Sequence, residues 1–307
     1  MEAVPTNTKH IVDDMADLEK PLSHAELADL SNLKTAGVDY LAQIWGNIEL
    51  DRRRKIINRL VELAEENFEL NFDVIYKVCL KDQDADIKVK AIEGLWENEE
   101  ITLISVFIRM LNEDKSEIVQ AAAAKALSKF ALLAELKKLG PASSSRVSQA
   151  LLAILNDSTK PREVWRRALE AAAPLSLPDV KKAIGEAYKS ADIKIKNSAL
   201  FSMGKNCDAA WLPILIKELS NINPNVRYEA AGACGEVCAE EAVPYLIKLT
   251  QDKDIEVQQA AIIALGRIGG IKAKAHLMEL VKGPDESAAE AAETALKQVD
   301  TEDEELF

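Results

Sequence analysis

The chain has 307 residues, of which 48% are hydrophobic, and a formal net charge of −13 at pH 7. Most of the negative charge lies at the two ends: residues 1–50 contain nine acidic residues and three lysines, and five acidic residues fall within residues 300–305. The region between the ends is nearly neutral, so no whole segment supplies the basic stripe that nucleic-acid binding normally requires. No apolar run of 18 or more residues is present, which excludes a membrane-spanning helix.

Residues 1–41 form an acidic N-terminal segment that lies outside the repeated part of the sequence. Ser23 and Glu26 form a capping box, which predicts a short helix near residues 23–34. The apolar side of this helix consists of Leu27, Leu30 and Leu33. We expect the helix to cover the apolar edge of the first repeat, because the terminal units of repeat proteins need such a cap. No secretory signal is recognisable in the first 20 residues, so we expect a cytoplasmic protein.

One pattern repeats through residues 42–299. Each unit has an apolar anchor residue, and the anchors are Ile56, Ile87, Val119, Val164, Ile195, Val226, Val257 and Ala288. The last four anchors follow one another at a constant step of 31 residues, and each is followed four positions later by an alanine. A fixed period of this length indicates stacked helical units, none of which can bury its apolar face alone. The sequence therefore predicts an all-α fold, a right-handed α-solenoid of about eight helical hairpins.

Each unit reads as two helices, with a polar residue placed to cap the second. In the unit over residues 211–238, Asn223 is a good N-cap and Pro224 follows at the first helical position. A similar cap stands three residues before most anchors: Asp84, Ser116, Asp192, Asn223, Asp254 and Asp285. The alanines four residues past the anchors should let neighbouring second helices approach closely.

The stretches from Asn223 to Gly235 and from Asp254 to Gly266, with Val243-Pro244 at the start of the following unit, carry a pattern that resembles the HEAT-repeat superfamily. The short step is similar to the HEAT-like units of the phycobilin lyase group. The whole chain also resembles a bacterial family of HEAT-repeat proteins in which the stretches 51–54 and 63–70 recur. The resemblance implies the fold, and it brings no activity with it.

Two segments depart from the repeat. The step from Val119 to Val164 contains an insertion at residues 131–148, where we expect a helical extension followed by a flexible connection over residues 140–145. The insertion is either a tolerated loop or a flap that faces a partner. The acidic tail over residues 300–307 is either a solvated end or a short motif that docks into another protein.

Exposed positions on the second helices predict one binding surface. The positions two and six residues past the anchor point away from the buried face, and in three successive units they hold Phe201, Tyr228 and Ile263, bordered by Asn197 and Gln259. Apolar patches with polar rims often mark binding sites. The alternative interpretation is that these side chains pack against flanking residues or turns. A second group, in the first repeats, is acidic and is interpreted as a solvated face: Glu62, Glu65, Glu66 and Glu93.

Signals for catalysis are poor. The three histidines, at His10, His24 and His276, are scattered, and no phosphate-binding loop, zinc spacing or nucleophile motif is present. We therefore predict no catalytic residue, no metal and no cofactor, and we expect four reduced cysteines in mostly buried positions.

The prediction for function is a scaffold or adaptor that binds another protein on the concave face of the solenoid. The expected protein is a monomer that binds no nucleic acid and does not insert into a membrane. The alternative is a lyase-like or other enzyme accessory subunit that holds a small molecule in the concave cleft.

Overall fold

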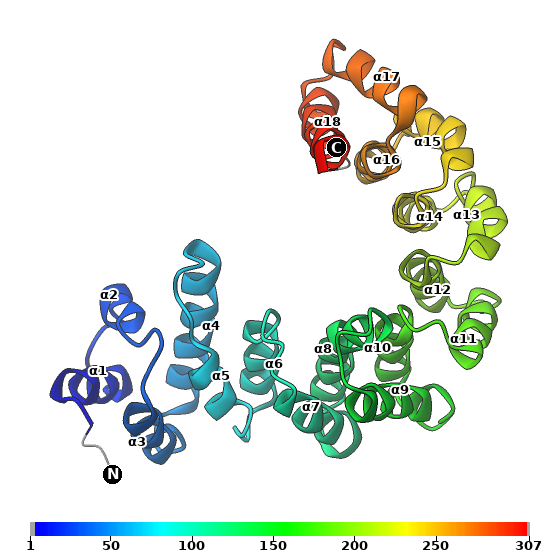
Figure 1. The fold of residues 1–307 in the computed structure, drawn as a ribbon. Coiled ribbons are helices and arrows are strands. Elements are labelled where there is room, and N and C mark those ends of the chain that lie inside the picture. The colour runs from blue at the N-terminus through cyan, green and yellow to red at the C-terminus, as the bar shows by residue number, and fades with distance from the viewer. Residues whose placement is uncertain (1–3, 306–307) are drawn as a thin grey trace. The chain divides into compact units, whose positions relative to one another are not determined.

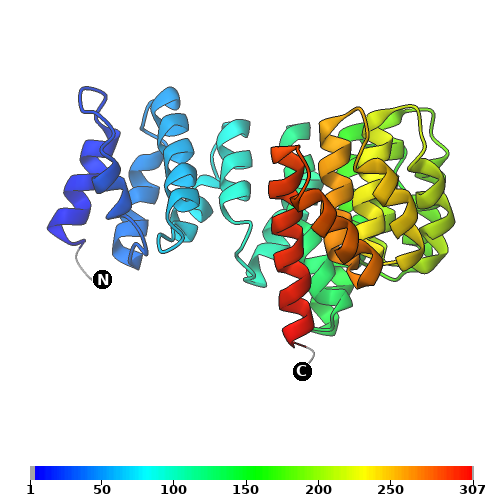
Figure 2. The ribbon, with the colours of Figure 1, turned by 90° about the horizontal axis from the view of Figure 1, so that it is seen from above.

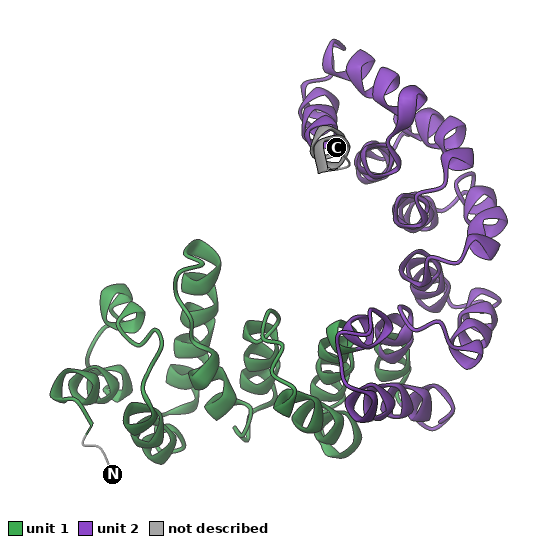
Figure 3. Ribbon diagram, in the orientation of Figure 1, with its two compact units in different colours: residues 1–130, 161–167 green, residues 131–160, 168–307 purple. Residues whose placement is uncertain are grey.

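The computed structural model describes residues 4–305, with side chains described up to residue 297. In this part of the chain, 18 α-helices and two short 3-10 helices follow one another, and no strand is present (Figure 1). The helices pair into hairpins, as the repeat predicts. The chain divides into two compact units: unit 1 comprises residues 1–130 and 161–167, and unit 2 comprises residues 131–160 and 168–307 (Figure 3). No helix of the described residues is long and apolar enough to cross a membrane.

Unit 1 begins with a cap that only partly matches the prediction. The Ser23 side chain accepts a hydrogen bond from the backbone N–H of Glu26, which confirms Ser23 as the N-cap, but the helix ends at Ala28 and turns follow it. An additional helix, which the sequence pattern did not predict, precedes this one in the chain, and its apolar side is buried. The helices of this region are α1 (Thr6–Ala16), α2 (His24–Ala28), α3 (Thr35–Trp45), α4 (Leu50–Glu66), α5 (Asp73–Cys79), α6 (Ala85–Gly94) and α7 (Thr102–Glu113).

Two helices, α8 (Glu117–Glu135) and α10 (Arg162–Ala172), begin in unit 1 and end in unit 2. The expected flexible connection in the insertion is wrong, because Gly140 is instead the N-cap of α9 (Pro141–Leu155). Pro141 suits the first helical position, where its missing N–H has no intrahelical partner to lose. The run of serines after it therefore forms the first turn of a helix.

The remaining helices of unit 2 form two layers (Figure 1). The first helices of the hairpins are α11 (Pro178–Tyr188), α13 (Leu212–Glu218), α15 (Val243–Leu249) and α17 (Gly270–Val281). The second helices are α12 (Ile193–Asn206), α14 (Pro224–Val237), α16 (Ile255–Ile268) and α18 (Glu286–Glu305). Each second helix packs against the next, and Figure 2 shows this succession from above. Helix α18 continues into the predicted acidic tail, whose side chains lie outside the described residues.

The predicted caps are confirmed at five of six positions. Each of these side chains accepts a hydrogen bond from a backbone N–H two or three residues later: Asp84, Asp192, Asn223, Asp254 and Asp285. Ion pairs that the pattern did not predict join consecutive units. Arg227, one residue past its anchor, donates to both carboxylate oxygens of Asp252 at 2.7 and 2.6 Å. Lys88 and Asp114 occupy the same two repeat positions in unit 1 and also form an ion pair.

Glycine and alanine set the close spacing of the second helices in unit 2. A Cβ on Gly204 would lie 2.7 Å from the Cα of Ala233, and one on Gly235 would lie 2.9 Å from the Cα of Ala264. A real side chain cannot approach backbone so closely, so only glycine fits at these positions. The alanines predicted to permit this packing, Ala230 and Ala261 among them, are fully buried.

Cysteines occupy two kinds of position. Cys79 and Cys234 are buried, as predicted, whereas Cys207 and Cys238 are exposed. The exposed pair ends helices α12 and α14 in the left-handed conformation, each with φ of 52°. Each thiol lies within hydrogen-bonding distance of a carbonyl in its own last turn, at 3.2 Å. They are therefore helix-ending residues rather than core residues.

Candidate functional site

The predicted surface of unit 2 lies on three adjacent helices, α12, α14 and α16. Phe201, Tyr228 and Ile263 are 38%, 45% and 45% exposed, so each keeps part of its side chain open to solvent. Asn197 is half-buried and Gln259 is exposed, one on each side of the tyrosine in the repeat register. We call these five residues the α12–α16 patch.

The middle helix of the α12–α16 patch has an open position at Gly232, which we call the hollow. The residue between Phe201 and Ile263 in the repeat register is Gly232, and a Cβ built there would meet no atom within 4 Å. Two large apolar side chains therefore flank an open position on the middle helix, and Tyr228 lies one turn away on the same helix. Unlike Gly235, which is required by packing, Gly232 has space that the fold does not use.

The apolar surface extends further toward the helix N-termini than the sequence reasoning recognised. Ile193 and Ile255, which lie two residues before their anchors, are both exposed, and Pro224 occupies the same position on α14. The signal was available in the sequence, since these positions are one helical turn from Asn197 and Gln259.

Charged residues border the other end of the patch. Glu236 accepts from Lys205 at 2.9 Å and from Arg267 at 2.5 Å, which links the last turns of three successive helices. The ammonium group of Lys205 also lies 5.9 Å from the centre of the Phe201 ring. Asn197 contributes a carbonyl oxygen that is buried without a hydrogen-bond partner in the described part of the chain. The patch thus combines apolar residues, an open hollow and a polar border.

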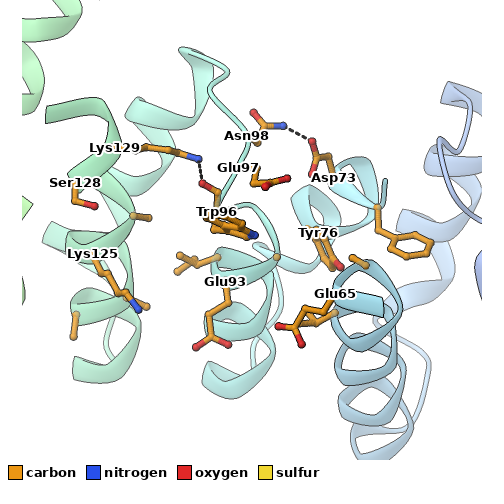
Figure 4. Close-up of a pocket in the computed structure, with 18 of the residues that line it drawn as sticks. Glu65, Asp73, Tyr76, Glu93, Trp96, Glu97, Asn98, Lys125, Ser128 and Lys129 are labelled. Carbon is orange, nitrogen blue, oxygen red and sulfur yellow. Dashed lines mark hydrogen bonds between the residues drawn. The ribbon is translucent and has the colours of Figure 1, made fainter. Parts of the chain in front are cut away.

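Unit 1 contains a groove with a cavity volume of about 1240 Å³ (Figure 4). Its walls come from the C-terminal half of α4, the start of α5, the end of α6 with the loop after it, and α8, with two residues of α10. Trp96, which is 70% exposed, lies among these elements. The sequence analysis did not single out this tryptophan.

The loop that carries Trp96 is held on both sides. The ammonium group of Lys129 donates to the carbonyls of Leu95 and Trp96, both at 2.8 Å, and the Asn98 amide donates to Asp73 at 2.6 Å. Burial lowers the pKa of Lys129 to about 8, against the opposing effect of nearby carboxylates. The backbone around the indole is therefore fixed by specific hydrogen bonds.

The acidic residues of the first repeats do more than form a solvated face. Glu65 and Glu93 line the groove. Glu62 and Glu66 instead form ion pairs with the Arg59 guanidinium, with N–O distances of 2.6 and 3.5 Å. Sequence periodicity could not separate the two pairs, because all four residues occupy exposed helical positions. Only the ending of α6 at Gly94 opens the space that Glu65 and Glu93 face.

The histidines stay apart in the structure. His24 lies beside Arg59, His276 beside Thr250, and His10 beside Asp14. Among the residues whose side chains are described, no three histidine, cysteine or acidic residues converge to hold a metal ion.

The paired helices, their constant step and the capped second helices define a class of protein, the α-solenoids built from helical hairpins. A family model described as HEAT repeats matches residues 72–173 and 212–297, which together make up more than half of the chain. The chain belongs to the HEAT-repeat family. No curated protein matches it in sequence.

Several solved structures share the fold at low sequence identity. A chain of the Kap95:Nup1 complex superposes with a TM-score of 0.51 at 14% identity, over 97% of this chain and 46% of that one. YibA from E. coli has a TM-score of 0.45 at 18% identity, over 82% of this chain and 98% of its own. Human deoxyhypusine hydroxylase, in complex with glycerol, has a TM-score of 0.38 at 18% identity, over 86% and 96%. At these identities the likeness concerns the fold alone.

Proposed function

We propose that the chain is a protein-binding scaffold and that a partner protein docks on the α12–α16 patch. One observation carries this proposal: Phe201 and Ile263 remain exposed on either side of the open position at Gly232. An apolar side chain of a partner would fill that hollow and remove both flanking residues from water. Interfaces are commonly organised in this way, with a buried aromatic anchor inside a polar rim.

The family supports a binding role in general terms. The HEAT-repeat fold is used widely for holding other proteins, and the Kap95 structure is that of a complex. Our proposal includes a cytoplasmic, monomeric protein of bacterial type, which binds neither nucleic acid nor a membrane and uses no cofactor. We also propose that the chain is not an enzyme.

The hollow permits a test in which stability and binding move in opposite directions. Gly232→Leu should raise the free energy of unfolding by up to about 1 kcal/mol, because leucine favours a helix and its Cβ meets no atom within 4 Å at this position. The same side chain would occupy the hollow and should weaken partner binding at least tenfold. Tyr228→Ala should fold normally and should also weaken binding at least tenfold, as expected for an interface anchor.

Tyr245 provides a matched control. It is a similarly exposed tyrosine, at 43%, on the first helix α15, outside the patch. Proteins captured from a cell lysate by the immobilised chain should be lost with Gly232→Leu and Tyr228→Ala and retained with Tyr245→Ala. The dissociation constants of the recovered protein then give the size of each effect. Retention by all three variants would rule out the α12–α16 patch as the docking surface.

A further inference from the structure

The groove of unit 1 exists because one second helix is short. Helices α12, α14 and α16 each have 14 residues, and nine residues past the anchor they carry Gly204, Gly235 and Gly266, which pack against the next helix. Helix α6 has 10 residues and ends at Gly94, so the equivalent position, Trp96, lies beyond its end. A turn of packed helix is thus replaced by an exposed indole in a groove.

Trp96 is placed for binding before any partner arrives. Lys129 holds the carbonyls of Leu95 and Trp96, so the backbone that carries the indole is fixed by two hydrogen bonds. Gly94, two residues before Trp96, packs directly against the Tyr76 ring. A Cβ at this position would lie 2.5 Å from the ring, so only glycine allows this contact. An aromatic group fixed in advance loses little conformational freedom when it binds.

The charges of the groove favour a cation. Six carboxylates and three cations line it. Two of the cations are engaged, because Lys129 holds the loop and Arg167 pairs with Glu163. Glu65, Glu97 and Glu117 form no ion pair within the described part of the chain, and no cation among the described residues lies over Trp96. Lys125 and, toward Glu97, the Lys129 ammonium offset them only in part, since the groove has three more carboxylates than cations.

A polar group of the groove also needs a partner. Tyr76 lines the groove, and its hydroxyl is buried without a hydrogen-bond partner among the described residues. Burial raises the pKa of this hydroxyl, so it stays protonated and is a donor. Buried donors in proteins are normally paired, and a carbonyl of a bound segment would supply the acceptor that is missing.

We propose that the groove of unit 1 binds a lysine- or arginine-containing segment of a partner protein, with a cationic side chain on the face of Trp96. A cation over tryptophan is the most favourable of the cation–aromatic pairs, and the carboxylates around it add Coulomb attraction. A volume of about 1240 Å³ exceeds that of most small-molecule sites, which suits several residues of an extended chain. An apolar helix would fit poorly, because it would bury the unpaired carboxylates without compensation.

This site shares no residue with the α12–α16 patch, and its test is independent of it. The full chain is titrated into a fluorescein-labelled lysine-rich peptide, and anisotropy is followed at low and physiological ionic strength. A peptide of the same length with acetylated lysines and a glutamate-rich peptide are the ligand controls. We expect the lysine peptide to bind, more weakly as salt rises, and neither control to bind comparably.

Variants separate the groove from general attraction to an acidic protein. Trp96→Ala should weaken binding of the lysine peptide roughly tenfold, and Trp96→Phe should weaken it less, because phenylalanine is a poorer cation acceptor. Glu97→Gln should weaken binding several-fold. The matched control is Glu113→Gln, at the exposed end of α7 outside the groove, which should leave binding unchanged. Circular dichroism confirms that each variant is folded, and Glu97→Gln tests the groove if Trp96→Ala does not fold.

Two results would overturn the inference. One is a Trp96→Ala chain, or a Glu97→Gln chain, that binds the lysine peptide as tightly as the wild type. The other is equal loss from Glu97→Gln and Glu113→Gln, which would mean diffuse attraction. Tyr228→Ala should leave this binding unchanged, so failure at the groove and failure at the α12–α16 patch are distinguishable.

Discussion

The second helices of unit 2 and the early repeats of unit 1 solve the same packing problem with different side chains. In unit 2, Gly204 and Gly235 bring neighbouring helices together until backbone meets backbone. Ion pairs join consecutive repeats in both units, and in unit 1 a buried carboxylate adds a further contact between repeats. The Trp45 indole donates to buried Asp82 at 2.6 Å, and Arg53 pairs with the same carboxylate at 2.5 Å.

The difference shows how a repeat protein makes room for a site. Close glycine packing brings the second helices of unit 2 together, and the proposed binding groups Phe201 and Tyr228 lie on the exposed side of these helices. Packing through long side chains tolerates a shortened helix, because the hydrogen bonds of Lys129 replace the missing turn. A groove then opens between helices. The following predictions test this contrast.

The largest effect is expected from Trp45→Ala. Trp45 is buried and hydrogen-bonded to Asp82, so its loss creates a cavity and leaves a carboxylate with one partner fewer. Replacing a buried tryptophan by alanine costs about 3–5 kcal/mol. Urea denaturation of the full chain measures the change. A loss below about 1 kcal/mol would show that unit 1 does not depend on this contact.

A pair of glycine substitutions on one helix tests the packing of unit 2. Gly235→Ala should lower the free energy of unfolding by about 1–3 kcal/mol, because the added methyl group meets the backbone of Ala264. Gly232→Ala should raise it by about 1 kcal/mol, because the same methyl group meets open space. Both values come from chemical denaturation. Equal effects from the two substitutions would contradict the close approach of α14 and α16.

Lys129, which holds the loop at the groove, should make the free energy of unfolding depend on pH. Burial lowers the pKa of Lys129 to about 8 in the folded chain, against 10.5 for an exposed lysine. Between these values the unfolded chain binds more protons, so the wild type should gain stability as pH rises from 8 to 10.5. The gain relative to Lys129→Met should be about 1 kcal/mol, once partial exposure of the amine is allowed for.

Denaturation of both proteins at several pH values measures this difference, and titration of the other groups cancels between them. Below pH 8 the difference should be constant. A wild type that instead loses stability relative to Lys129→Met above pH 8 would mean that the folded chain favours the charged amine.

The smallest effect is expected from Trp96→Ala. The indole is 70% exposed, and its loop is held by main-chain hydrogen bonds that the substitution leaves in place. Surface substitutions of this kind change stability by about 0.5 kcal/mol or less. The thermal midpoint should therefore stay close to that of the wild type. A large fall would assign Trp96 to the core and remove it as a binding residue.

The spacing of apolar and small residues was sufficient to predict the repeated hairpins. Val226 and Val257 are fully buried at the predicted anchors, and Asn223 and Asp254 cap the helices that follow them. These features depend on residues within one helix or its cap, so the sequence determines them locally. The exposure of Phe201, Tyr228 and Ile263 follows from the same register. It does not reveal a partner.

Only the tertiary structure decided where the chain departs from the repeat. Position 94, at the end of helix α6, accepts only glycine because the Tyr76 ring, from the preceding helix, occupies the space beside it. Lys129, more than 30 residues later, holds the main-chain carbonyls of Leu95 and Trp96 in the loop that follows. Gly232 and Gly235 are both glycines on helix α14, and the sequence does not distinguish their roles. In the structure Gly235 packs against the backbone of the neighbouring helix α16, whereas Gly232 faces open space. Each depends on side chains that meet across separate helices, which a periodic pattern along one chain does not specify.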